Sequence, residues 1–182
     1  MNEPVDRSRR IAVLGLGNPI LTDDAVGLRV VDRLKTILEE HPIPGVDILV
    51  STRAGFELID LLQGYGRAVI VDCLDLPEPE PGRVRRLDLS SFAGSVRLNS
   101  AHDLNISTAF ELARTMGIPM PASVVIFAVE GRDVRTLAES MTPAVEEAVE
   151  PLAGEIHAFL KADPPAVDAG APPQPREPFY GP

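Results

Sequence analysis

Five short runs with the residue pattern of β-strands alternate with segments that have the spacing of helices. This alternation constrains the fold of the chain more than any other feature. The runs are Ile11 to Leu16, Val46 to Ser51, Ala68 to Leu74, Arg83 to Leu87 and Val124 to Val129. Runs rich in Val, Ile and Leu are typical of strands buried on both faces, and intervening helices are the pattern of a mainly parallel sheet. We therefore expect an α/β fold, a three-layer α/β/α domain with a central, mainly parallel, twisted sheet of about five strands.

Apolar residues recur at helical spacing between these runs. The three clearest stripes are Val26, Val30, Leu34 and Ile37; then Ile106, Ala109, Phe110 and Ala113; and last Val145, Val149, Leu152, Ile156 and Phe159. The first helix should end before His41-Pro42, because proline restricts the residue before it to extended backbone. Thr142-Pro143 predicts the N-cap and first residue of the last helix.

The length and composition favour one domain with short flanking segments. A chain of 182 residues with 45% hydrophobic content can bury one substantial core. We assign residues 1–10 to an N-terminal extension and residues 11–162 to the domain. Residues 163–182 are rich in proline and poor in large apolar side chains, which predicts a disordered tail.

Charge and cysteine content exclude several classes of partner. The formal net charge of -10 argues against nucleic acid, because phosphate binding depends on clustered Lys and Arg. The single Cys73 allows no internal disulfide, which fits a reducing compartment. No stretch approaches the roughly 20 apolar residues needed to cross a bilayer. We therefore expect a cytoplasmic protein with neither a membrane nor a nucleic-acid partner.

Acidic residues and one histidine follow the predicted strands. In open parallel sheets, ligands bind beyond the carboxyl ends of the strands, where the strand order reverses. The loops expected at that edge carry Asn18, Asp23, Asp24, Asp72, Asp75, His102, Asp103 and Glu130. These residues are therefore the candidates for chemistry.

Three of these candidates make a set that suits a metal. Capping the first helix requires only one of two adjacent aspartates, so we assign Asp23 as the cap and Asp24 to function. Asp72 follows a buried apolar run, where an unpaired charge costs several kcal/mol. With His102, the two carboxylates suit a borderline divalent ion such as nickel or zinc, exchangeable or carried by a substrate. The residues alone leave open a satisfied strand-end carboxylate for Asp72 and a solvated loop histidine for His102.

Four segments in order resemble one protein family. They are Gly15-Leu-Gly-Asn-Pro-Ile-Leu-Thr-Asp-Asp-Ala-Val-Gly27, Val69-Ile-Val-Asp72, Ser100-Ala-His102 and Met141-Thr-Pro-Ala-Val-Glu146. Together they are similar to the hydrogenase maturation endopeptidases, from about Ile11 to about Leu160. The resemblance implies a phosphorylase/hydrolase-like α/β/α fold.

The resemblance also implies an activity and a site. The family removes the C-terminal extension of a nickel-iron hydrogenase large subunit after nickel has been inserted, and is often classed with aspartic proteases. By motif, its metal-recognition residues fall on Asp24, Asp72 and His102, and its catalytic carboxylates on Asp24 and Asp72. The implied metal is nickel carried by the substrate, which zinc or cadmium could replace. The implied partner is the large-subunit precursor, bound by a monomeric protease.

The sequence departs from the family in one segment and leaves two alternatives. Many relatives carry an aspartate and a Gly-Gly-Thr run after the second strand, where this chain reads Val50-Ser51-Thr52-Arg53. A peptidyl-tRNA hydrolase shares the opening Gly-Leu-Gly-Asn-Pro, but the expected nearby histidine is missing and the acidic charge disfavours tRNA. A non-catalytic, nickel-binding assembly chaperone would use the same trio and stays open.

Overall fold

The five predicted strands form one sheet. The computed structural model of the chain describes residues 6–52, 56–89 and 103–166. The strands are β1 (Ile11–Leu16), β2 (Val46–Ser51), β3 (Arg67–Asp75), β4 (Val84–Asp88) and β5 (Ser123–Gly131), in the order β2-β1-β3-β5-β4. β2, β1, β3 and β5 are parallel, and β4 pairs antiparallel with β5 at the edge. The prediction of a mainly parallel sheet is confirmed.

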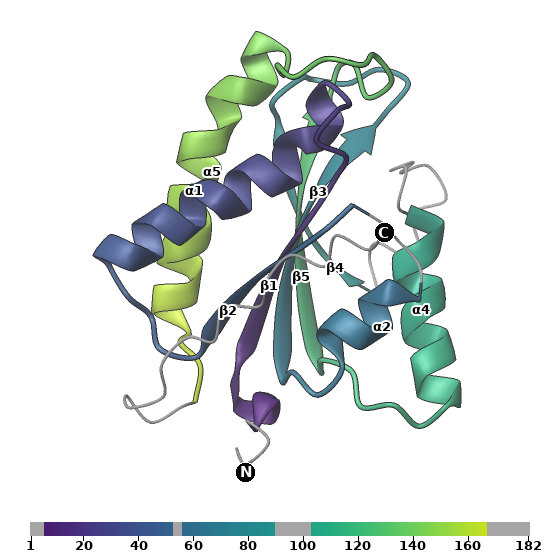
Figure 1. Cartoon of the computed structure of the whole chain (residues 1–182), viewed down its shortest axis with the longest axis vertical. Coiled ribbons are helices and arrows are strands. Elements are labelled where there is room, and N and C mark those ends of the chain that lie inside the picture. The colour runs from purple at the N-terminus through teal and green to yellow at the C-terminus, as the bar shows by residue number, and fades with distance from the viewer. Residues whose placement is uncertain (1–5, 53–55, 90–102, 167–182) are drawn as a thin grey trace.

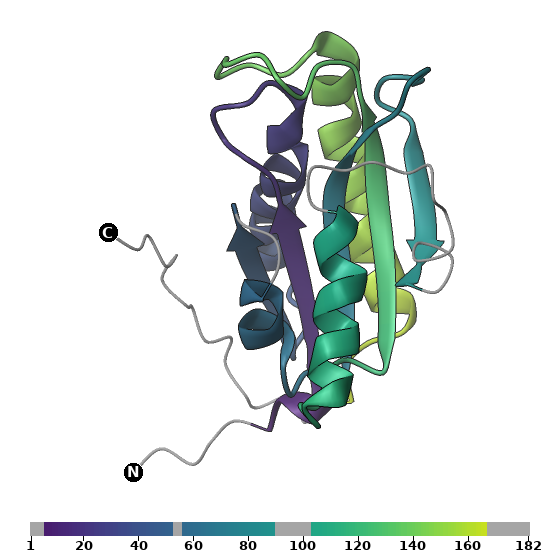
Figure 2. The same ribbon diagram turned by 90° about the vertical axis from the view of Figure 1, so that its right-hand side faces the viewer.

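Helices cover both faces of the sheet, which confirms the three layers. On one face lie α1 (Val26–Glu40) and α5 (Pro143–Ala162), and on the other lie α2 (Glu57–Leu62) and α4 (Asp103–Thr115) (Figure 1). Turning the molecule by 90° shows the sheet face-on, with α4 in front of the strands (Figure 2). The sequence did not predict α2, because six residues are too few for helical periodicity to stand out.

The position of a residue along its strand determines which of the two helical layers its side chain packs against. In β3, Val71 and Cys73 pack with the core that α1 and α5 cover, whereas Ile70 and Leu74 pack with the core beneath α2 and α4. Successive side chains of a strand point to opposite faces. Asp72 therefore faces the layer that contains α2 and α4.

Two glycines allow the start of α1 to lie against the strand ends. A Cβ at Gly27 would stand 2.2 Å from the carbonyl oxygen of Leu16 and 2.4 Å from that of Val71. Gly17 has a φ of +151°, and a Cβ there would stand 2.0 Å from the carbonyl oxygen of Asp24. Any larger residue would push the backbone segments apart. The turn that carries Asp24 consequently packs closely against the carboxyl end of β1 and the middle of β3.

Residues on either side of the predicted domain limits contact the domain. Arg10 is 3% exposed, and its Nε donates to Oδ2 of Asp47 at 2.7 Å. The Tyr65 hydroxyl donates to the same oxygen at 3.0 Å, and burial together with the charge of Asp47 raises the pKa of Tyr65 to about 12. Asp163 accepts from Arg67 through its backbone carbonyl at 2.9 Å.

No helix in the described segments has the length and apolarity that a membrane span requires. Residues 167–182 of the predicted tail lie outside the described residues.

Candidate active site

Asp24 and Asp72 lie at the point where the strand order reverses. From β1 the chain proceeds to β2 on one side and then crosses to β3 on the other, so the reversal falls between β1 and β3. Asp24 belongs to the turn after β1 and is 2% exposed, and Asp72 belongs to β3 and is 1% exposed. The pairing of β1 with β3 ends at Gly15 and Val71. On the side of β1, Asp72 therefore lies beyond the paired residues, next to the turn that follows β1, while on its other side it pairs with Ala128 of β5.

A backbone N–H orients each of these two carboxylates. The N–H of Asn18 donates to Oδ2 of Asp24 at 2.8 Å, and the N–H of Cys73 donates to Oδ1 of Asp72 at 2.8 Å. Burial raises the pKa of the Cys73 thiol, and the negative charges of Asp72 and then Asp24 raise it further. The charges of both carboxylates therefore raise the pKa of the same buried thiol. The thiol stays protonated and is not a candidate nucleophile.

Asp23 has a different role from the predicted helix cap, and that prediction is wrong. Its carboxylate is fully buried and accepts four hydrogen bonds: from the N–H of Arg132 at 2.8 Å, of Asp133 at 2.9 Å and of Thr142 at 2.7 Å, and from the Thr142 hydroxyl at 2.9 Å. A capping side chain accepts from an N–H two or three positions further along its own helix. Neither α1 nor the short 3₁₀ turn Asp23–Ala25 before it has a side-chain cap. Asp23 instead joins the turn after β1 to the loop between β5 and α5.

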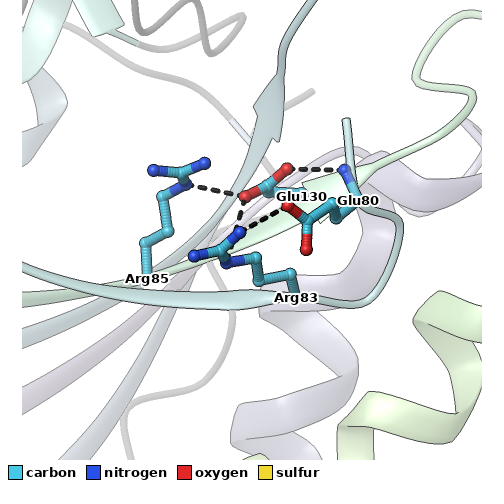
Figure 3. A network of polar contacts seen from close by, with 4 residues as sticks. All are labelled: Glu80, Arg83, Arg85 and Glu130. Atoms are coloured by element: carbon cyan, nitrogen blue, oxygen red, sulfur yellow. Dashed lines mark hydrogen bonds and ion pairs between the residues drawn. The ribbon is translucent and has the colours of Figure 1, made fainter. Parts of the chain in front are cut away.

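Glu130, another predicted candidate, is engaged in a structural network (Figure 3). Its side chain is 1% exposed; Oε1 accepts from Nε of Arg85 at 2.7 Å, and Oε2 accepts from the N–H of Glu80 at 2.7 Å. Arg83 approaches at 3.9 Å and also pairs with the Glu80 side chain. The network joins the turn between β3 and β4 to the end of β5. Figure 3 shows both arginines directed at the Glu130 carboxylate.

The remaining candidates lie nearer the surface or outside the described residues. Asp75, at the end of β3, pairs with Arg135 at 3.0 Å. His102 and Arg53 lie outside the described residues, and α4 begins at the residue after His102. Within residues 6–52, 56–89 and 103–166, no group of three or more His, Cys, Asp and Glu side chains is arranged to hold a metal ion. The described part of the chain thus supplies two members of the predicted trio.

One acidic residue near the site escaped the sequence reasoning. Glu57, the first residue of α2, accepts a hydrogen bond from the hydroxyl of Ser51 at 3.3 Å. Ser51 ends β2, and its carbonyl accepts from the N–H of Gly17 at 3.3 Å. Glu57 therefore brings a carboxylate to the end of β2, in the region where the sequence lacks the family's usual aspartate. Only a prediction of α2 could have pointed to it.

A surface hollow of about 480 Å³ lies elsewhere, between α4 and the start of β5. Asp88, Phe110 and Ser123 are among its lining residues, and neither Asp24 nor Asp72 contributes to it. The chemistry of the described residues concentrates at the opposite edge of the sheet.

Known proteins match this chain in sequence and in fold. Residues 28–158 match the family model described as hydrogenase maturation protease. Hydrogenase 2 maturation protease of Escherichia coli (strain K12) is 30% identical over 155 residues, which cover 84% of this chain and 91% of that protein. The hydrogenase expression/formation protein HupD of Bradyrhizobium diazoefficiens is 27% identical over 149 residues, 80% of this chain and 74% of that protein.

Among solved structures, the hydrogenase maturating endopeptidase HybD from E. coli superposes with a TM-score of 0.70. It is 28% identical in sequence, and the match covers 85% of this chain and 94% of that one. The sequence and structure matches extend well beyond the site motifs, over most of the domain.

Proposed function

The chain belongs to the hydrogenase maturation protease family, and on that premise we propose that it removes the C-terminal extension of a nickel-iron hydrogenase large subunit after nickel insertion. The enzyme is a hydrolase that cuts a peptide bond within the precursor. Its substrate is the large-subunit precursor, in keeping with the maturation proteases that it resembles.

The pair of buried carboxylates at the strand-order reversal is the observation that supports this function. Asp24 and Asp72 come from different elements, are 2% and 1% exposed, and are each oriented by a backbone N–H. Hydrolysis of a peptide bond requires a base that takes a proton from the attacking water. We assign that role to this pair, which makes the enzyme an aspartic-type endopeptidase.

Nickel would belong to the substrate in this proposal. Two carboxylates and an imidazole suit a borderline divalent ion, and buried carboxylates are costly unless they are paired or bind a metal. We propose that Asp24, Asp72 and His102 bind the nickel of a loaded precursor, so that only a loaded precursor is aligned for cleavage. The ion would polarise the water or the scissile carbonyl. Zinc or cadmium could occupy the same ligands in vitro.

The oligomeric state, the location and the absence of other partners are also proposed. We propose that the protein acts as a monomer in the cytoplasm, where its single cysteine stays reduced. Its net charge of -10 disfavours a nucleic-acid partner. We propose no membrane partner either.

Intact-mass spectrometry of the precursor tests the function. The full chain is incubated with a purified, nickel-loaded large-subunit precursor, and the expected result is loss of a C-terminal peptide. An unchanged precursor mass would overturn the protease assignment and favour the nickel-binding chaperone. A parallel incubation with nickel-free precursor tests the metal: cleavage at an equal rate would contradict the proposed nickel recognition.

A further inference from the structure

Exposed apolar side chains occur at the end of the sheet that holds Asp24 and Asp72, and two of them, Ile20 and Leu137, belong to segments that contact each other. Among the described residues, the exposed large apolar side chains are Ile20 (59%), Val50 (44%), Phe56 (69%), Met116 (63%) and Leu137 (71%). All except Met116 belong to loops or strand ends at the carboxyl edge of the parallel strands. Exposed apolar side chains that gather beside a site, rather than scatter singly, indicate a surface that contacts a partner.

Ile20 and Leu137 belong to two segments that pair through their backbones. Leu21 and Leu137 form an antiparallel bridge. The N–H of Ala138 donates to the carbonyl of Ile20 at 3.1 Å, and the N–H of Thr22 donates to the carbonyl of Thr136 at 3.0 Å. We call residues 20–22 and 136–138 the rim ribbon. Figures 1 and 2 show the loops that contain it at the same end of the molecule as the start of α1.

The rim ribbon is firmly joined to the turn that carries Asp24. The hydroxyl of Thr22 donates to the carbonyl of Thr136 at 2.6 Å, which reinforces the backbone bond between the same two residues. The next residue, Asp23, accepts from Arg132, Asp133 and Thr142 on the same loop. The exposure of Leu137 therefore belongs to an ordered surface, held in a fixed position relative to Asp24.

One edge of the ribbon is open. In an antiparallel ladder, a residue pair that lies between two cross-strand bonds directs its own N–H and C=O away from the partner segment. Leu137 occupies such a position, since the bonds flanking it involve Thr136 and Ala138. Within the described parts of the chain, no backbone group bonds to the N–H or C=O of Leu137. An open strand edge of this kind is a template for a further strand.

We propose that residues 136–138 are the docking edge for the precursor, which adds an extended segment beside Leu137. This inference rests on the proposed function and names the surface that the substrate occupies. Strand addition satisfies the backbone groups of Leu137, and the exposed Leu137 side chain contacts an apolar side chain of the bound segment.

An extended polypeptide is the occupant that fits this position. Leu21, which bridges Leu137, is three residues before Asp24, and three residues of chain span at most about 11 Å. A peptide paired with residues 136–138 lies two strand spacings, about 10 Å, from residues 20–22, so about six residues of extended chain can bring a peptide bond to Asp24. The edge binds main-chain groups of any sequence, whereas the Leu137 side chain favours an apolar residue in the bound segment.

Serine substitutions test the docking edge. Cleavage of the nickel-loaded precursor is measured for the full chain and for Leu137→Ser, Ile20→Ser and the double variant, with KM and kcat determined separately. Leu137→Ser should raise KM about tenfold, equivalent to about 1.4 kcal/mol, and Ile20→Ser should raise it less, because Ile20 is one segment farther from the open edge; both should leave kcat and the thermal midpoint near those of the original chain. Met116→Ser removes an equally exposed side chain at the C-terminal end of α4 and should change neither constant.

A proline substitution tests the backbone contact. Leu137→Pro removes an N–H that the ribbon itself does not use, so KM should rise more than in Leu137→Ser while the thermal midpoint is kept. If Leu137→Pro unfolds, the KM of the serine variants still tests the docking edge. A KM within twofold of that of the original chain for Leu137→Ser would overturn the docking edge while cleavage itself is intact. Absence of cleavage by the unaltered chain would instead overturn the proposed function, and the docking edge with it.

Discussion

Thr142 donates both its backbone N–H and its hydroxyl to the carboxylate of Asp23, at 2.7 Å and 2.9 Å, although the two residues are 119 positions apart. Thr142 is the N-cap residue of α5, as the sequence predicted, yet its hydroxyl does not cap that helix. The two bonds hold the start of α1 against the start of α5. Of the adjacent aspartates, Asp23 is therefore the one that secures the turn to the loop before α5.

The stability of the protein should depend strongly on Asp23. Asn at this position would direct its NH₂ group at N–H donors, so we expect Asp23→Asn to lower the free energy of unfolding by about 2–4 kcal/mol. Thr142→Val keeps the backbone bond and should cost about 1 kcal/mol. Urea unfolding measures both. Asp32→Asn, on the exposed side of α1, serves as the control, and equal stability of the Asp23 and Asp32 variants would contradict the role of Asp23.

Two helical glycines should respond to alanine in opposite directions. Alanine favours a helix over glycine by about 1 kcal/mol. At Gly27 the added Cβ would lie 2.2 Å from one backbone oxygen and 2.4 Å from another, so we expect a net loss of about 1–3 kcal/mol. At Gly154 nothing lies within 4 Å, and alanine should stabilise α5 by about 0.5–1 kcal/mol. Thermal or urea unfolding compares the pair, and a stabilising Gly27→Ala would show that α1 does not pack as closely as described.

Arg85 should stabilise the edge strand β4 through Glu130. Arg85→Met removes a charge-assisted bond to a carboxylate that is 1% exposed, and we expect a loss of about 1.5–3 kcal/mol in the free energy of unfolding. Arg83 is 3.9 Å from the same carboxylate and 49% exposed, so Arg83→Met should cost less than about 1 kcal/mol. Equal losses in the two variants would contradict the conclusion that Arg85 stabilises the network in Figure 3 more than Arg83 does.

Stability at high pH should depend on Tyr65. Its folded pKa of about 12 lies above the unfolded value of about 10. The stability that protonated Tyr65 contributes is therefore fully present below pH about 10 and is lost as the pH rises toward about 12. Tyr65→Phe should lose less stability over that window than the unaltered chain, as measured by urea unfolding at a series of pH values. Identical alkaline losses in the two proteins would contradict the contribution of Tyr65.

Cleavage should require Asp24, Asp72 and His102 individually. Asp24→Asn and Asp72→Asn remove a charge and a base while keeping the shape, so we expect the rate of precursor processing to fall by at least about 10²-fold. His102→Ala should fall comparably if it completes the metal site. Asp75→Asn, at a more exposed carboxylate on the same strand, is the control and should process at the original rate. Processing at the original rate in all three site variants would contradict the assignment of Asp24, Asp72 and His102 to the active site.

The local features of the fold could be read from the chain because their causes are local. β1 and β2 have the predicted bounds, Ile11–Leu16 and Val46–Ser51, since buried apolar runs and adjacent turns mark strands directly. The six residues of α2 escaped prediction because fewer than two turns leave no clear stripe. Glu57 was missed with it.

Contacts between distant segments account for the errors at the site. Asp23 was predicted to cap α1 because an aspartate at a helix start ordinarily does so. Its donors lie 109 to 119 positions later, and no local pattern indicates them. Glu130 stood among the rim candidates for the same reason, because Glu80 and Arg85 reach it only once β4 pairs with β5.

The sequence by itself determined the layers, the parallel sheet and the gathering of acidic residues at one edge, because hydrophobic periodicity and turn chemistry act over a few residues. It also determined the family, through motifs that occur in order along the chain. Only the tertiary structure decided which of two adjacent aspartates holds the turn, which carboxylates are neutralised by arginines, and which apolar side chains stay exposed beside the site. Those outcomes depend on hydrogen bonds and packing between segments that meet only when the sheet is complete.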